Sequence, residues 1–118
     1  MKGSAGFTDF VVGQLAEFGA VMPRRMFGGV GLYFDGVFFG LIDEDALYFK
    51  VSDATRPRYE SAGSAPFKPF ADKPSMQGSY EVPEDILEDP EELAAWAREA
   101  HGVALAAKRP SRGRSRKT

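Results

Sequence analysis

Residues 24–51 read RRMFGGVGLYFDGVFFGLIDEDALYFKV, and this stretch decides the fold. It holds half of the Phe and Tyr residues of the chain in under a quarter of its length. Asp35-Gly36 separates two apolar runs, and this pair is a strong hairpin signal because both turn residues need a positive φ. We therefore predict an antiparallel hairpin between residues 30–34 and 37–42.

The stretch continues through an acidic turn, residues 43–45, into a third strand. In residues 46–51 large apolar side chains occupy every second position, which is the period of a half-buried strand. The sequence therefore predicts a meander of three antiparallel strands, preceded by a short strand at residues 24–27.

The middle strand of this meander has no polar face. Strict alternation would put Val37, Phe39 and Leu41 on one side and Phe38 and Ile42 on the other. We therefore expect this strand to be central and covered on both sides, by helices or by another subunit.

Outside this stretch the pattern predicts helices on both sides of the sheet sequence. Thr8 is the expected N-cap of a first amphipathic helix that ends at Gly19. Asp53 is the expected cap of a short helix at 54–61. Residues 64–79 contain three prolines, which indicates an edge strand with a loop or a loop alone, and residues 79–82 are predicted to form one more strand.

The last helix has the clearest start signal. Asp89 is followed by Pro90 and two glutamates, which combines an N-cap carboxylate, proline at the first helical position and acids near the positive end of the dipole. Apolar residues then recur at helical spacing, and many are alanines that allow close packing on the sheet. The fold class predicted from these elements is α+β, an antiparallel sheet with flanking helices.

The domain boundaries follow from composition and charge. We expect a flexible leader at 1–7, one domain at 8–107 and a disordered basic tail at 108–118. The whole chain has a net charge of −2, but the tail holds six cations and no acid. These cations are the candidate nucleic-acid contacts: Lys108, Arg109, Arg112, Arg114, Arg116 and Lys117.

The sequence contains no Cys and no apolar run near the ~20 residues that span a bilayer. Its N-terminus also lacks the apolar region and cleavage site of a signal peptide. We therefore expect a cytoplasmic protein without membrane contact, disulfides or cysteine chemistry.

Several segments together carry a family resemblance. RRMFGGVGLYFDG, LYFK, GSAPFKPF, SYEVPEDIL and ELAAWAREA, in this order, closely resemble the N-terminal domain of the TfoX/Sxy family, bacterial proteins associated with the regulation of natural competence. The resemblance covers roughly residues 8–107. It implies a secretion-chaperone-like domain with the order α-β-β-β-α-β-β-α and no established catalytic residues, here standing alone without the family's C-terminal domain.

The glycine cluster between the arginines and the hairpin is a candidate anion or ligand site. Arg24 and Arg25 with Gly28 and Gly29 would form it, in a loop that extends to Gly31. The cluster lacks the GxxxxGK[ST] pattern and leads into a strand rather than a helix. The favoured interpretation is therefore structural: glycines that allow a close approach of neighbouring strands, and arginines paired with carboxylates.

Other chemistry-bearing residues favour structural roles too. His101 is the only histidine, so a metal site would need carboxylates alone to complete it, and a solvated or helix-end position is expected. Asp43-Glu44-Asp45 lacks the ligand spacing of a calcium loop, and Trp96 is expected in the core. We predict no catalytic residue, metal or cofactor.

Three classes of function remain after this comparison. The first is a non-catalytic regulatory domain that binds a protein partner, with a second copy of the chain among the candidates. The second is a nucleic-acid accessory protein that uses its basic tail for weak, sequence-independent binding. The third is an enzyme or small-ligand binder with a pocket near Arg24, Arg25 and the glycines.

Overall fold

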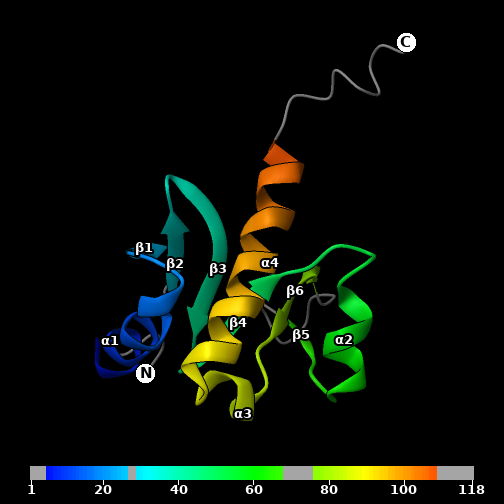
Figure 1. Ribbon diagram of the computed structural model, residues 1–118, viewed down its shortest axis with the longest axis horizontal. Helices are drawn as coiled ribbons and strands as arrows, with labels where there is room; N and C mark the ends of the chain where they lie inside the picture. The colour runs from blue at the N-terminus through cyan, green and yellow to red at the C-terminus, as the bar shows by residue number, and fades with distance from the viewer. Residues whose placement is uncertain (1–4, 27–28, 68–75, 109–118) are drawn as a thin grey trace.

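The computed structural model describes residues 5–26, 29–67 and 76–108 of the chain (Figure 1). Within these residues it has a six-stranded antiparallel sheet in the order β1-β2-β3-β4-β6-β5, so the α+β class is confirmed. The strands are β1 (Met22–Met26), β2 (Gly29–Phe34), β3 (Val37–Asp43), β4 (Ala46–Lys50), β5 (Pro66–Phe67) and β6 (Met76–Glu81). The helices are α1 (Ala5–Gln14) with the 3-10 turn η1 (Leu15–Glu17), α2 (Arg56–Ser61), α3 (Glu84–Leu87) and α4 (Pro90–Lys108).

Both tight turns of the meander have the predicted geometry. Asp35 and Gly36 have φ values of 54° and 78°, and Glu44 and Asp45 have values of 52° and 59°. Two successive residues with positive φ match the right-handed twist of the flanking strands. The two turns therefore define the pairing of β2 with β3 and of β3 with β4.

The central strand β3 contains a bulge that changes which residues share a face. Leu32 is opposite Gly40 but Tyr33 is opposite Phe38, so Phe39 is an extra residue in the ladder. A bulge shifts the alternation by one residue. Phe39 and Ile42 are consequently both fully buried under the helices. The predicted grouping of Phe39 with Leu41 was wrong, because strict alternation takes no account of a bulge.

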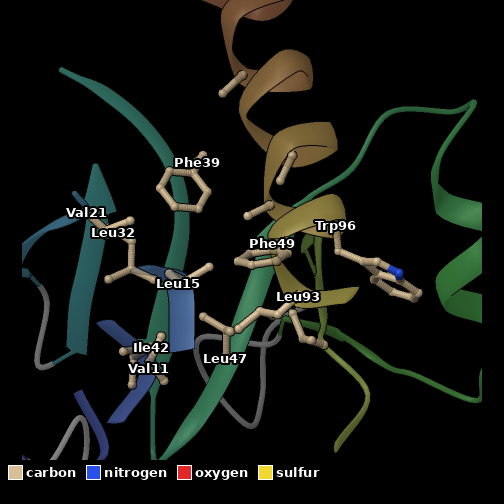
Figure 2. Packing of buried hydrophobic residues seen from close by; sticks show 14 of the residues in the cluster. Val11, Leu15, Val21, Leu32, Phe39, Ile42, Leu47, Phe49, Leu93 and Trp96 are labelled. Carbon is tan, nitrogen blue, oxygen red and sulfur yellow. The ribbon is translucent and has the colours of Figure 1, made fainter. Parts of the chain in front are cut away.

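The main core lies between one face of the sheet and the helices (Figure 2). Helix α1 contacts β1 and α4, and η1 contacts α4. Helix α4 packs on β3 and β4 with small side chains that let it approach closely. The largest fully buried side chains include Val11, Leu15, Leu32, Phe39, Ile42, Leu47, Phe49 and Leu93. We call this side of the sheet the covered face.

The predicted start of α4 agrees with the structure, and the predicted start of α1 does not. Asp89 Oδ1 accepts bonds from the backbone N–H groups of Glu91 (3.2 Å) and Glu92 (3.3 Å), so its role as N-cap of α4 is confirmed. Helix α1 begins at Ala5, within the segment predicted as leader. Thr8 therefore lies inside the helix, and the prediction that it caps the helix was wrong.

The edge strands complete the sheet. Strand β1 pairs with β2, and the two-residue β5 lies beyond β6, which confirms an edge strand in the proline-rich segment. Residues 68–75 of that segment and residues 109–118 of the basic tail lie outside the described chain. No helix in the described ranges is both long and apolar enough to cross a membrane.

Candidate interaction surface

The second face of the sheet carries aromatic and charged side chains. Paired residues of neighbouring strands project to the same side, so the register places Tyr33 with Phe38, and Leu41 with Tyr48 and Glu81, opposite the buried Ile42 and Phe49. We call this side the open face, because the helices of the described chain pack on the covered face. Its side chains include Met22, Arg24, Met26, Tyr33, Phe38, Leu41, Tyr48, Lys50, Phe67 and Glu81.

Aromatic rings of the open face form two neighbouring pairs. The ring centroids of Tyr33 and Phe38 are 5.4 Å apart, and those of Tyr48 and Phe67 are 5.0 Å apart. All four side chains are half-buried although no helix in the described residues packs on them. Large apolar side chains that stay in contact with water in this way are typical of a surface that binds another molecule.

Cations lie over the rings at two points. The Arg24 guanidinium carbon is 5.7 Å from the Tyr33 ring centroid, and Lys50 Nζ is 5.1 Å from that of Phe38. Both distances suit an attraction between a cation and the negative face of a ring. The open face therefore combines an apolar centre with charges whose stems cover part of it.

Gly31 allows the side chains of this face to close over β2. A Cβ at this position would lie 2.5 Å from Met26 Sδ, 3.1 Å from the Phe38 ring and 3.3 Å from the Tyr33 ring. The missing side chain is therefore replaced by contacts from three neighbours. This close approach supports the structural interpretation of the glycine cluster.

Gly29 has a similar role against the backbone. A Cβ there would lie 2.5 Å from the carbonyl oxygen of Ile42 on β3. Gly28 lies outside the described residues. The register places Arg24 opposite Gly31 and Arg25 opposite Val30, so the two arginines start on opposite faces of β1. The anion site made of these four residues stays a prediction.

Acidic groups lie at the other side of the open face. Burial raises the pKa of the Tyr48 phenol above its ordinary value, and the nearby carboxylates of Glu81, Asp43 and Glu44 raise this pKa further. A tyrosine phenol is neutral at physiological pH even at its ordinary pKa, and both effects favour this neutral form further. The open face has Arg24 on β1, Lys50 on β4 and carboxylates around Tyr48, so it presents both signs of charge.

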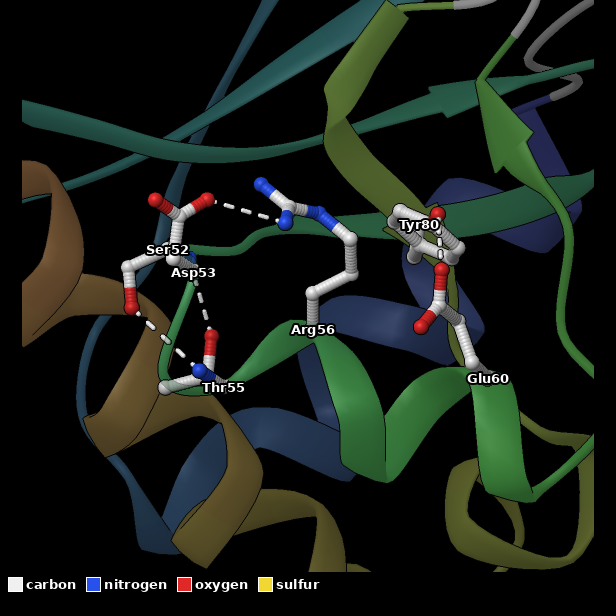
Figure 3. Close-up of polar contacts among 6 residues, drawn as sticks. All are labelled: Ser52, Asp53, Thr55, Arg56, Glu60 and Tyr80. Atoms are coloured by element: carbon white, nitrogen blue, oxygen red, sulfur yellow. Dashed lines mark hydrogen bonds and ion pairs between the residues drawn. The ribbon is translucent and has the colours of Figure 1, made fainter.

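Polar contacts attach α2 to the sheet (Figure 3). Ser52 and Thr55 bond reciprocally: the Ser52 N–H donates to Thr55 Oγ1 (2.9 Å), and the Thr55 N–H donates to Ser52 Oγ (3.3 Å). Asp53, predicted as the cap of this helix, instead forms an ion pair with Arg56 at 2.9 Å. The Tyr80 hydroxyl donates to Glu60 at 2.9 Å. These contacts hold α2 in place beside the sheet, so we assign these polar side chains a structural role.

Trp96 lies in the core as predicted. Its ring makes an edge contact with Tyr59 of α2, with centroids 4.8 Å apart, and the Arg58 guanidinium lies 4.7 Å from the Trp96 centroid. Arg58 also forms an ion pair with Glu99. Burial and the charge of Glu99 raise the pKa of Tyr59 strongly, and its hydroxyl has no partner within the described chain.

His101 was predicted at a solvated or helix-end position, and it lies in the last part of α4. Its ring is half-buried and makes edge contacts with Phe18, Phe34 and Phe39. The distance from its Nε2 to the Phe34 carbonyl oxygen is 3.2 Å. The two elements that meet here are 67 residues apart in sequence, so no local signal could have shown the contact.

The part of the chain that the structure describes contains no cluster of metal-binding side chains. No group of three or more His, Asp or Glu side chains there could hold a metal ion. The acidic turn at 43–45 forms the β3-β4 hairpin. Of the predicted nucleic-acid contacts, Lys108 ends α4 and the remaining five lie outside the described residues, so this site stays a prediction.

The geometry defines a class of protein: a small α+β domain whose antiparallel sheet has helices on one face and an aromatic, charged surface on the other. The family model for the TfoX N-terminal domain matches residues 13–104 of the 118. The chain belongs to this family, as its sequence motifs predicted. A comparison with curated proteins finds no match.

Proposed function

We propose that this protein is a non-catalytic interaction domain that binds a protein partner through its open face. The observation that carries this proposal is the pair of ring contacts, Tyr33 with Phe38 and Tyr48 with Phe67, on the side of the sheet away from the helices. Burying such rings against a partner contributes free energy in proportion to the apolar area removed from water.

Membership of the family supports a proposal for the role within the cell. TfoX-type domains are associated with competence regulation, and we propose that the chain acts in transcriptional regulation by contacting another protein. Two features support contact over catalysis: the conspicuous side chains of the open face are aromatic, and Gly29 and Gly31 have steric roles.

The test is affinity capture of the full-length chain from its native cells, comparing the wild type with Phe38→Ser. We expect the amount of each specific partner to fall roughly tenfold or more, since aromatic anchors dominate interface energies. Phe10→Ser is the matched control, because Phe10 is 43% exposed on α1, away from the open face. Capture that is unchanged by Phe38→Ser would contradict the proposal.

A further inference from the structure

We propose that the partner of the open face is a second copy of this chain, related by a two-fold axis along β3. This inference rests on the proposed function and specifies its partner. The axis would place Arg24 of each copy against Glu81 of the other.

One row of residues across the open face carries the argument. The register aligns Arg24 on β1, Gly31 on β2, Leu41 on β3, Tyr48 on β4 and Glu81 on β6. Neighbouring strands lie about 4.8 Å apart. The cation at one end and the carboxylate at the other are therefore about 10 Å from Leu41, on opposite sides of it.

A two-fold axis that lies in the interface and runs along β3 exchanges the two ends of this row. Arg24 then lies opposite Glu81 of the second copy, and the same contact occurs twice. Leu41 meets its own equivalent at the axis. Tyr48 lies opposite Gly31, where it would contact the side chains of Met26, Tyr33 and Phe38 that close over this glycine. The arrangement is that of two sheets packed face to face with nearly aligned strands.

The charges of the face select this partner over a nucleic acid. Both Arg24 and Glu81 are exposed, and the carboxylates around Tyr48 would repel a phosphate backbone. In the dimer, opposite charges of the two copies meet at both ends of the row. The face is therefore complementary to itself and poorly suited to a polyanion.

Pairing of the two copies also explains why β3 has apolar residues on both of its sides. Strand β3 has apolar residues on both sides, but the helices of the described chain cover only one of them. In the dimer, Phe38 and Leu41 on the axis would be covered by the β3 of the second copy. The two apolar sides of β3 are then both removed from water.

The experiment is a charge exchange in the full-length chain, read by sedimentation velocity over a concentration series. Arg24→Glu and Glu81→Arg each bring like charges together at both contacts, and we expect each to weaken dimerisation roughly tenfold or more. The double variant Arg24→Glu/Glu81→Arg restores opposite charges and should return to within about threefold of the wild type, a difference of less than 1 kcal/mol.

Arg98→Glu is the matched control, because Arg98 is exposed on α4 and its reversal changes the net charge as Arg24→Glu does. It should leave dimerisation unchanged. Urea unfolding of each variant checks that the fold is retained.

A wild type that stays monomeric at every concentration would overturn this inference. A double variant as weak as the single ones would overturn it as well. Binding of a single-stranded oligonucleotide by a monomeric wild type, abolished by Phe38→Ser, would assign the rings to base stacking instead. The first two outcomes leave the proposed protein-binding domain in place, which fails if Phe38→Ser leaves partner capture unchanged. The third outcome would replace its protein partner with a nucleic acid.

Discussion

The two faces of the sheet can be compared at adjacent residues of one strand. Phe39 is fully buried, with ring contacts to Phe18 and Phe49 on the covered face. Phe38 is half-buried on the open face, next to Tyr33 and under Lys50. The side chains are identical, so the difference comes from the face that each one points to. A buried ring contributes mainly to stability, and an accessible one is available for binding.

Alanine substitutions at these two residues should separate stability from binding. Phe39→Ala removes a ring from a packed core, and we expect it to lower the free energy of unfolding by about 3–5 kcal/mol. Phe38→Ala leaves no enclosed cavity and should cost about 1 kcal/mol, with the larger effect on partner binding. Urea unfolding at protein concentrations where the chain is monomeric measures both values. Equal losses would show that the two faces are equally buried within one chain.

Two glycines of β2, Gly29 and Gly31, test how tightly each one is packed against its neighbours. Gly29→Ala would bring a methyl group 2.5 Å from the Ile42 carbonyl oxygen, which belongs to the backbone and has little room to move. We expect a loss of about 1–3 kcal/mol in unfolding free energy. Gly31→Ala meets the flexible Met26 side chain first, so its cost should be smaller. Thermal unfolding of both variants tests this order, and a larger loss for Gly31→Ala would contradict it.

The hydroxyl groups of Tyr59 in the core and Tyr48 on the open face give the smallest expected difference in stability. The buried Tyr59 hydroxyl has no partner within the described residues, so Tyr59→Phe should raise the free energy of unfolding by about 1 kcal/mol at neutral pH. Burial raises the pKa of Tyr59, which stabilises its neutral form in the folded state. This stability is present below pH ~10, the ordinary tyrosine pKa, and is lost as the pH rises above it.

The measurement is urea unfolding of the wild type and Tyr59→Phe between neutral pH and about pH 11, with Tyr48→Phe as the matched comparison. The wild type should lose stability above pH ~10, and Tyr59→Phe should lose less. Tyr48 has a raised pKa too but is only half-buried, so Tyr48→Phe should change the slope less. A steeper loss in Tyr59→Phe would contradict a raised pKa at this residue.

Local sequence signals predicted the elements well. Asp35-Gly36 specified its hairpin, and Asp89 with Pro90 specified the start of α4, because these signals act within a few residues. Thr8 shows the limit of such signals. A good capping residue does not stop a helix from starting three residues earlier, at Ala5.

The candidate site could be predicted only in part. The apolar residues on both sides of β3 predicted that each face of this strand packs against another part of the chain or against another subunit. The bulge at Phe39 decides which residues of β3 point to the open face. The position of this bulge is set by the pairing of β3 with β2, which the sequence of β3 alone does not show. Arg24 was a candidate anion ligand, with pairing to carboxylates as the favoured interpretation, and its contact with the Tyr33 ring was not predicted.

The sequence by itself determined the two hairpin turns, the last helix, the α+β class and the family. These depend on backbone preferences and motifs that reside in short stretches of the chain. Tertiary structure alone decided that Phe39 and Ile42 share the covered face, that His101 meets three phenylalanine rings, and that Arg24 and Glu81 end one row. The physical reason is that strand register and helix docking join residues far apart in sequence, and packing of the whole domain selects among the locally allowed arrangements.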